Sequence, residues 1–567
     1  MEIDLTAMTP EMTRELNRIA EGYRKPYTEF IDRLSEQFAN SKFWWDTPLV
    51  SRNIHICRNF LDICLLRLAM DIASQGHPTG WIVHEQGMQQ ALKDNLGARD
   101  IQVASDAQLG RKAKIKEKIL RSPLAASEYA FYAFQRRIRN IQKWHGKKSL
   151  DAFRGRELTL VSTYRVPAEV KNGVLQDRYF PGLKENSDED IVFFAHPVFG
   201  NEAEGKQLLD VLHVSDDHIC IYDWIEPNDF GEVRKYIRWC RNASVPQCTF
   251  DGMDVTALVK EAFRTGAADN NTMYGIVKGR VLCRLVEQYD LKIKCLIDWY
   301  EGQPSSNAMI LRFRKKFPHV PTVGCETWSL EEKWLSLFPS KRQVEKRVVP
   351  EYFGVMGRGW VNPIRQFCRD VKCIVAPSFR NQAVFDVAPV DEVDNRRGIL
   401  LVLSYFKDCT VELLQTLGKA LQGMNGADIG PLYIKNHPTN QRWKLSDYGI
   451  PDDMFQGWDI TYLAGDIYDA LRGKAIVILC KSTSTLEIVL SGAYTVNFIP
   501  KGEISMVAIP EKVRDKVTIA YDAEDLRAAI KTGKEGLKGT GADQLREASF
   551  VRCNRDTVGA FLALREI

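Results

Sequence analysis

The stretch IVILCKSTSTLEIVLSGAYTVNF, residues 476–498, contains the pattern that decides the fold. Its apolar start, residues 476–480, predicts a buried strand. The turn that follows holds four consecutive hydroxyl residues, Ser482, Thr483, Ser484 and Thr485. Apolar spacing up to Leu490 then predicts a helix, and Thr495–Phe498 predicts the next strand. A strand, a helix and a second strand in this order indicate a parallel α/β sheet.

The same alternation continues on both sides of this stretch. Helices are predicted at Thr410–Gln422 and Ala523–Thr532. Earlier strands are predicted at Cys373–Ala376, Gly398–Ser404, Leu432–Lys435 and Ile460–Tyr462. Because helices separate the strands, one mostly parallel sheet should account for the second half of the chain.

The first half of the chain has a similar rhythm. Its strands are predicted at Leu158–Ser162, Ile191–Ala195, Ile219–Tyr222, Ile293–Ile297 and Thr322–Gly324. Two shorter strands, Gly80–His84 and Ile101–Val103, come before them, and residues 10–75 show the apolar spacing of helices. Residues 331–360 are charged and predict irregular structure.

Together these patterns predict an α/β protein with two facing Rossmann-like domains. We expect a helical region over residues 1–75, the two domains over residues 76–370 and 371–545, and a C-terminal helix over residues 546–567. Ligands of open parallel sheets bind at the carboxyl ends of the strands. Loops from both domains should therefore face a shared cleft.

The composition excludes several classes of protein. A net charge of +4 over 567 residues, without an RNA-binding motif, argues against a nucleic-acid partner. The 13 cysteines form no CxxC pair, so we predict no metal site and no disulfide framework, which fits a reducing cytoplasm. No signal-peptide pattern opens the chain, and no stretch reaches the roughly 18 apolar residues of a membrane span. We expect a cytoplasmic protein.

Residues 111–148 combine dense lysines and arginines with aromatic side chains. A basic amphipathic helix of this kind can lie in the interface of an anionic membrane, which would place the protein on the inner face of the inner membrane. A helix packed on its domain, with a solvated basic face, explains the same pattern. The sequence leaves both interpretations open.

Two polar loops follow strands of the second half. The first is formed by Lys435, Asn436, His437 and Pro438. His437 can donate a hydrogen bond to a phosphate oxygen, and Lys435 adds positive charge. The hydroxyl-rich turn 482–485, with the free amides of a helix start, can bind an anion. Alternatively, His437 is a plain turn residue, the hydroxyls cap the helix, and Glu487 completes a capping box with Ser484.

Charged residues near the cleft are candidates for chemistry in the first half. Asp298, Glu301 and Glu326 lie where strands end, and a carboxylate there can act as a base or a nucleophile. Glu301 could instead cap, or form a salt bridge with, the helix predicted at residues 306–316. Arg380, near the junction, has a guanidinium suited to a carboxylate or a phosphate. Its alternative role is an interdomain salt bridge.

Four motifs of the chain are typical of one family: IDWYEGQ (297–303), RFRKKFP (312–318), APSFR (376–380) and KNHP (435–438). They resemble bacterial surface-carbohydrate biosynthesis proteins, a capsule and lipopolysaccharide glycosyltransferase group of the GT-B architecture. The resemblance implies a GT-B-like fold, with an acceptor domain first and a nucleotide-sugar domain second. The chain departs from the family at Gly302, where the family has asparagine, and at Cys325-Glu326, where it has a tyrosine-glutamine pair.

More distantly, the His-Pro loop and the later hydroxyl-rich turn are similar to those of bacterial sialyltransferases, polysialyltransferases and Kdo transferases. This similarity implies that His437 contacts the donor phosphate. It also implies that Ser482, Thr483 and Ser484 contact the cytidine monophosphate (CMP) of a CMP-activated acidic sugar, without a bound metal.

We therefore predict a glycosyltransferase that needs no cofactor. It would move an acidic sugar, such as Kdo or a nonulosonic acid, from a CMP-sugar to a bacterial surface glycan or its lipid-linked precursor. Lys435–Pro438, the turn 482–485 and Arg380 would hold the nucleotide sugar, while Glu301 or Asp298 would act with His437 in catalysis. Two alternatives stay open: a sugar-nucleotide epimerase of the same two-domain fold, and a non-catalytic component of a polysaccharide assembly complex.

Overall fold

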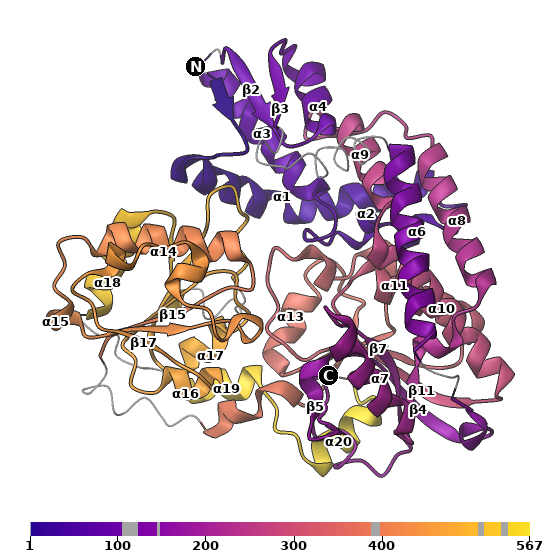
Figure 1. The fold of residues 1–567 in the computed structure, drawn as a ribbon. Coiled ribbons are helices and arrows are strands. Elements are labelled where there is room, and N and C mark those ends of the chain that lie inside the picture. Colours follow the sequence, from indigo (N-terminus) through magenta and orange to yellow (C-terminus); the bar gives the residue numbers. More distant parts are fainter. Residues whose placement is uncertain are drawn as a thin grey trace.

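The computed structural model describes residues 2–76, 78–104, 123–144, 148–386, 397–507, 515–534 and 542–566. Two α/β halves face each other, and a long N-terminal helix lies beside both (Figure 1). Each half is built on its own parallel sheet.

The described part of the first half contains a seven-stranded sheet in the order β14-β13-β12-β11-β4-β7-β8. Its strands are β4 (Glu157–Arg165), β7 (Ile191–Pro197), β8 (His218–Cys220), β11 (Lys292–Trp299), β12 (Thr322–Glu326), β13 (Tyr352–Val355) and β14 (Lys372–Val375). The helices around it are α7 (Glu202–Val214), α8 (Pro227–Asn242), α9 (Thr256–Gly266), α10 (Asn270–Gln288) and α11 (Pro304–Lys316). Nearly continuous apolar strands, such as β7, fit this arrangement because helices cover both faces of a parallel sheet.

The described part of the second half contains a six-stranded sheet in the order β17-β16-β15-β18-β19-β20. Its strands are β15 (Ile399–Val402), β16 (Leu432–Lys435), β17 (Ile460–Tyr462), β18 (Ile476–Leu479), β19 (Tyr494–Phe498) and β20 (Val517–Ala520). Its main helices are α14 (Lys407–Leu421), α16 (Ile467–Leu471), α17 (Thr485–Leu490) and α18 (Ala523–Lys534). The predicted α/β class and the two facing Rossmann-like halves, a GT-B-like arrangement, are confirmed.

The first sheet extends further along the chain than its sequence predicts. Strand β13 lies in the segment predicted to be irregular, and Cys373, predicted to open the second sheet, belongs to β14 at the edge of the first. Strand β13 pairs in parallel with both β12 and β14. This burial depends on distant partners, which a local pattern does not contain.

The N-terminal region has a small sheet of its own. Helices α1 (Pro10–Gln37), α3 (Asn59–Gln75) and α4 (Gln86–Leu96) accompany the strands β1 (Glu2–Asp4), β2 (Gly80–Val83) and β3 (Ile101–Val103). The sequence predicts that the first Rossmann-like domain begins at residue 76 and so includes β2 and β3. In the structure these two strands form a parallel sheet with β1 instead.

Helix α1 joins the N-terminal region to the second half. The Asn17 side chain donates to the Glu503 carbonyl at 2.9 Å and accepts from the Ser505 amide at 2.6 Å. Arg14 adds an ion pair with Asp525 at 2.8 Å. These contacts hold the second half against the same region that packs on the first.

The C-terminal segment is two helices rather than the single helix predicted. Helix α19 (Ala542–Ser549) packs against α17 of the second half, and α20 (Arg555–Leu562) packs against β14 of the first (Figure 1). The indole Nε1 of Trp360 donates to the Ser549 carbonyl at 3.0 Å. The end of the chain therefore crosses back to the first half.

The described part of the basic segment 111–148 includes the helix α6 (Pro123–Gln142). Phe131, Phe134 and Ile138 are buried against the domain, whereas Arg136 and Arg139 are exposed. The lysine cluster 112–118 lies outside the described residues. Among the described helices, none has both the length and the apolar character that crossing a bilayer requires.

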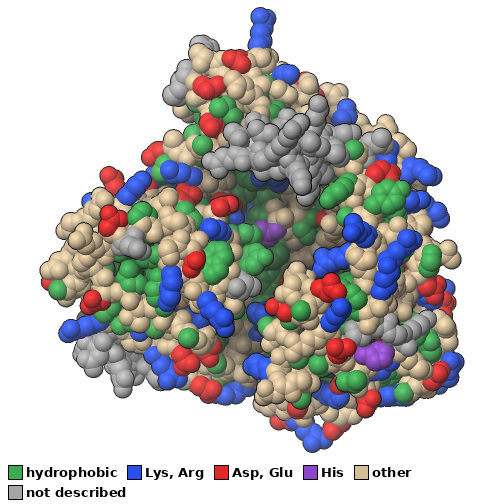
Figure 2. Space-filling view, in the orientation of Figure 1, with side chains coloured by type: hydrophobic (Ala, Val, Ile, Leu, Met, Phe, Trp, Pro, Cys, Tyr) green, Lys and Arg blue, Asp and Glu red, His purple; other side chains and the backbone are tan. Residues whose placement is uncertain are grey.

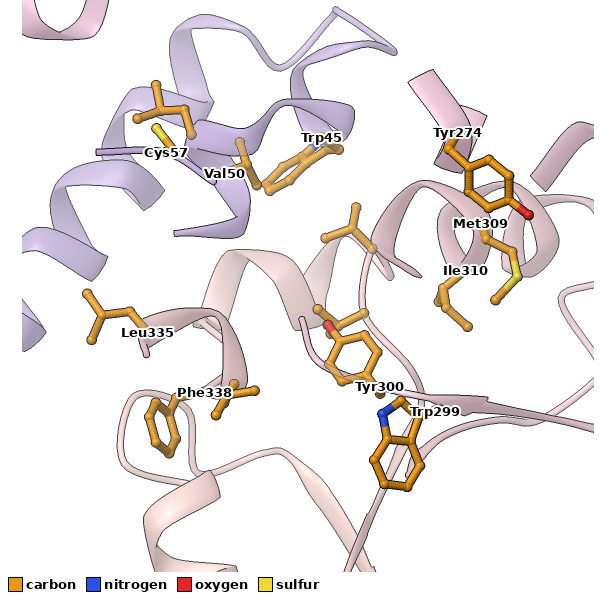
Figure 3. Close-up of a cluster of buried hydrophobic side chains, with 14 of the residues drawn as sticks. Trp45, Val50, Cys57, Tyr274, Trp299, Tyr300, Met309, Ile310, Leu335 and Phe338 are labelled. Atoms are coloured by element: carbon orange, nitrogen blue, oxygen red, sulfur yellow. The ribbon is translucent and has the colours of Figure 1, made fainter. Parts of the chain in front are cut away.

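Part of the first half's core lies at the end of β11. There Trp299 and Tyr300 are fully buried and point to opposite sides, with Leu335 and Phe338 nearby (Figure 3). The chain turns sharply after this point, so the residues that follow lie at the sheet's carboxyl edge, where the candidate site is found.

Candidate active site

A cavity of about 320 Å³ lies between the two halves. The second half contributes Lys435–Pro438 and Ser482–Ser484, and the first half contributes Trp328 and Arg380. The molecular surface is hollowed between the halves, with hydrophobic side chains inside (Figure 2). The structure thus brings the His-Pro loop and the hydroxyl-rich turn together in one place, which we call the interdomain cavity.

Sheet order explains why two loops about forty residues apart meet. The His-Pro loop follows β16 and the hydroxyl-rich turn follows β18, and these strands flank β15 on either side. All three are parallel, so their carboxyl ends share one edge. The loop after β15 lies there too: the Tyr405 ring meets the His437 ring edge-on, with centroids 5.5 Å apart.

The environment of His437 favours a neutral imidazole. Burial lowers its pKa, and the positive charges of Arg178 and Lys435 lower it further. A neutral imidazole carries one N–H that can donate to a phosphate oxygen. Sequence reasoning did not find Arg178, which belongs to the first half and is exposed.

Lys435 and Asn436 mainly hold the His-Pro loop in place. The Lys435 ammonium donates to the Gly465 carbonyl at 2.7 Å. Asn436 donates to the Trp443 carbonyl at 2.8 Å and accepts from the Tyr448 hydroxyl at 3.1 Å. Both side chains still line the cavity, and exposed Pro438 opens the short helical turn that follows.

The hydroxyl-rich turn divides into lining and supporting residues. Ser482, Thr483 and Ser484 line the cavity. Thr485 is fully buried and donates to the Ser482 carbonyl at 3.1 Å, so it shapes the turn rather than facing the cavity. Lys481 enters the turn at φ 45°, a strained conformation for a side-chain-bearing residue, and pairs with Glu503 at 2.6 Å.

Glu487 has a different role from the capping box considered above. One carboxylate oxygen accepts from the Asn381 amide of the first half at 2.7 Å, and the other has no hydrogen-bond partner among the described residues. Burial raises its pKa to about 7. Because Glu487 also lines the cavity, it is a candidate ligand contact.

Arg380 forms a wall of the cavity through aromatic contacts. Its guanidinium lies over the Trp299 ring at 5.5 Å and over the Tyr179 ring at 5.8 Å. Within the described part of the chain it makes no salt bridge, so the interdomain ion pair considered above is not formed. The guanidinium therefore has donors available for a ligand.

None of the three predicted carboxylates lines this cavity, and two of them, Asp298 and Glu326, line no cavity described here. Asp298 is buried in β11, where it accepts from the Ser162 hydroxyl at 2.5 Å and pairs with Lys278 at 3.4 Å. Glu326 is fully buried at the end of β12. Neither residue lines the interdomain cavity, so neither is placed to act on a ligand there.

Glu301 lines a second cavity of about 650 Å³ in the first half, which we call the N-terminal cavity. Its carboxylate accepts from the Trp299 indole at 3.0 Å and from the Gln303 amide. Burial raises its pKa, while these two hydrogen bonds act in the opposite direction. Since Trp299 also lies under Arg380, Glu301 is one side chain away from the interdomain cavity.

The structure explains the departure at Gly302. This residue has φ 61°, and a Cβ atom there would overlap the Ser336 carbonyl oxygen. Asparagine tolerates the left-handed conformation but not this close approach. Glycine is thus required by the loop that positions Glu301.

No protein-family model matches the sequence, and no curated protein is significantly similar to it. Solved structures of similar shape include UDP-GlcNAc 2-epimerases from Neisseria meningitidis, bound to UDP-GlcNAc, and Methanocaldococcus jannaschii. Each is 10% identical and covers 72% of this chain; they cover 98% and 100% of their own chains, with TM-scores of 0.38 and 0.40. Acinetobacter baumannii MurG is 12% identical over 72% of this chain and 99% of its own, with a TM-score of 0.36. These values assign no activity to the protein.

Proposed function

We propose that this protein is a nucleotide-sugar-dependent glycosyltransferase whose donor nucleotide occupies the interdomain cavity. The observation that carries this proposal is the meeting of the His437 loop and the turn 482–484 in one cavity that Arg380 also lines. A cleft between domains with a few convergent polar groups is a usual site for a small ligand.

Fixed donors in this cavity suit a departing phosphate. When the bond between sugar and nucleotide breaks, negative charge develops on the phosphate, and preorganised donors stabilise that charge. His437 supplies a neutral N–H, Lys435 and Arg380 supply positive charge, and the turn supplies hydroxyls. These groups can fill the role that a metal ion has in other transferases, so we propose a metal-independent reaction without a cofactor.

The donor is proposed to be a CMP-linked acidic sugar, such as Kdo or a nonulosonic acid. The similarity of the KNHP loop and the hydroxyl-rich turn to CMP-sugar transferases supports this choice. Arg380 can pair with the carboxylate of such a sugar. The available oxygen of Glu487 can accept a hydrogen bond from a ribose hydroxyl.

Glu301 is proposed as the general base for the acceptor, a bacterial surface glycan or its lipid-linked precursor. Its carboxylate would take the proton of an acceptor hydroxyl as that oxygen attacks the anomeric carbon. The bond from that carbon to the nucleotide phosphate breaks, and its electron pair leaves with the nucleotide.

Thermal-shift assays with CMP, UDP and GDP test the donor class. We expect CMP to raise the melting temperature most, because the proposed site binds CMP with the lowest Kd of the three. A ligand at a hundred times its Kd adds about 2.7 kcal/mol of stability. A variant with both Ser482→Ala and Ser484→Ala should lose most of this shift. Thr532→Ala, an exposed hydroxyl of α18, is the matched control. A larger shift with UDP would exclude the CMP-linked donor, and no shift with any nucleotide would remove the proposal.

We also propose that α6 brings the enzyme to an anionic membrane. Tyr129 and Tyr132 are 51% and 54% exposed on a helix that also exposes Arg136 and Arg139. The neighbouring α8 packs against α6 and exposes further arginines. Aromatic and basic side chains on one surface are typical of membrane-interface helices.

Vesicle co-sedimentation tests this surface. We expect binding to phosphatidylglycerol vesicles and little binding to phosphatidylcholine vesicles. Replacing both Arg136 and Arg139 with alanine should weaken binding about 30-fold, at about 1 kcal/mol for each arginine. The control replaces Arg472 and Lys531, two exposed cations of the second half. Equal binding by both variants would contradict the proposal.

A further inference from the structure

The N-terminal cavity is a second site with its own chemistry. It lies at the carboxyl ends of β4, β7 and β11, and α6 forms one of its walls. Arg380 and the rings of Trp299 and Tyr179 stand beside it toward the interdomain cavity. At about 650 Å³ it is twice the volume of that cavity and has room for a ligand of several rings.

Stacked aromatic rings form one side of the N-terminal cavity. The rings of His196 and Tyr274 are parallel, with centroids 3.8 Å apart, and the Tyr164 ring lies 5.1 Å from His196. Tyr179 continues the row at 6.1 Å from Tyr164. Broad apolar ring faces of this kind can pack against the C–H face of a sugar ring.

Hydrogen-bonding groups form another side of the cavity. Asn271 donates to the Gln303 carbonyl oxygen at 2.6 Å, and the Gln303 amide donates to Glu301. This network fixes one carboxylate and two amides in defined orientations. Planar amides and a carboxylate placed beside aromatic rings provide donors and acceptors of the kind that bind sugar hydroxyls.

Two buried groups beside this network lack a protein partner. Neither His196 Nδ1 nor the Tyr274 hydroxyl has a hydrogen-bond partner among the described residues, and both atoms are buried. A buried polar group without a partner costs roughly 1–3 kcal/mol, so such groups are rare outside ligand sites and water sites. Both residues line the N-terminal cavity, so the described protein leaves two polar groups unsatisfied at its wall.

We infer that the N-terminal cavity binds sugar rings of the acceptor glycan. The sugar rings would stack on His196 and Tyr274, and Gln303 and Asn271 would bind the sugar hydroxyls. This inference rests on the proposed function, because it places the acceptor hydroxyl at Glu301. Most of the lining side chains are uncharged: burial holds the pKa of His196 well below its ordinary value, and the charged exceptions are Glu301 and, on α6, Arg137. One carboxylate and one guanidinium among aromatic rings and amides suit the hydroxyls of a glycan segment.

The test places a large side chain in the N-terminal cavity from helix α6, which forms its exposed wall. Ala133 is exposed on α6 and lines the cavity, so Ala133→Trp should occupy part of it without disturbing the core. Asn140→Trp places the same side chain on an exposed position of the same helix and is the matched control. Labelled full-length proteins are applied to a printed array of bacterial surface oligosaccharides, and CMP thermal shifts are measured in parallel.

We expect the wild type and Asn140→Trp to bind a common set of oligosaccharides, and Ala133→Trp to bind them at least tenfold more weakly. The CMP shift should be the same in all three proteins. No oligosaccharide binding by the wild type, or equal binding by Ala133→Trp, would overturn the inference. Oligosaccharide binding without any nucleotide binding would instead contradict the proposed function alone.

Discussion

Replacing His437 with alanine should lower kcat/KM for sugar transfer by about 10²–10³-fold, the usual cost of removing one donor to a developing negative charge. The imidazole lies in the interdomain cavity beside the hydroxyl-rich turn, and burial together with nearby positive charge keeps it neutral near pH 7. The imidazole therefore keeps one protonation state, with one N–H, over a wide pH range above its pKa.

A glutamine at this position separates hydrogen bonding from shape. His437→Gln keeps an N–H donor near the place of an imidazole nitrogen, so we expect it to recover part of the lost rate. His319→Ala, at an exposed position of the first half, is the matched control. Transfer assays with each variant provide the measurement, and wild-type kcat/KM in His437→Ala would refute a role for this histidine.

The meeting of the two polar loops could be predicted from the sequence, because each loop is a local motif. Each polar loop directly follows an apolar strand, and parallel strands place such loops at one edge. The turn 482–484 and the loop 435–438 are both found there. Thr485 was grouped with its neighbours because pattern alone does not separate a lining hydroxyl from one that bonds to its own turn.

Residues that depend on distant partners escaped prediction. Glu487 reads as a helix cap, since its amide partner Asn381 lies in the other half. Tyr179 and Arg178 belong to no motif. The fold of the first half brings Tyr179 to Arg380, and the packing of the two halves brings Arg178 near His437. Asp298 shows the opposite error: its position after apolar residues suggested exposure at the cleft, but a serine and a lysine enclose it.

The end of the first sheet shows the same limit at the level of the fold. Strand β13 has four residues between charged segments, and its identity depends on pairing with β12 and β14. One glycine does indicate a local requirement from sequence alone. Gly302 stands where the similar family has asparagine, and the close approach of Ser336 shows why this loop needs glycine.

The second large effect is expected at Glu301. Glu301→Gln removes a general base while keeping the size of the side chain and an oxygen for the Trp299 indole. We expect kcat to fall by about 10²–10⁴-fold, the range for positioned acid–base groups. The CMP thermal shift should be unchanged, because Glu301 does not line the interdomain cavity. Steady-state transfer assays and thermal shifts on the same preparation measure both effects.

The pH dependence identifies the protonation state that acts. A base works when deprotonated, so the rate should fall as the pH drops through the pKa of Glu301. Burial raises that pKa above the ordinary value of 4.5, so the acid limb of the wild-type profile should lie at higher pH than for an exposed glutamate. Protonation of His437 does not explain such a limb, because the protonated imidazole still carries N–H donors for the phosphate. In Glu301→Gln the limb should disappear along with the rate.

Glu326→Gln, the same substitution at a buried glutamate of the adjacent strand, is the matched control. Glu326 is a fully buried carboxyl at the end of the adjacent strand, and burial alone raises its pKa far above the ordinary value. Burial thus favours the neutral form of this carboxyl, which the replacing glutamine resembles, and Glu326 lines neither cavity. Activity kept in Glu326→Gln and lost in Glu301→Gln would assign the effect to the position of the carboxylate. If Glu301→Gln instead kept both its rate and its acid limb, the acceptor proton would have to leave by another group, and the N-terminal cavity would hold its ligand without reacting with it.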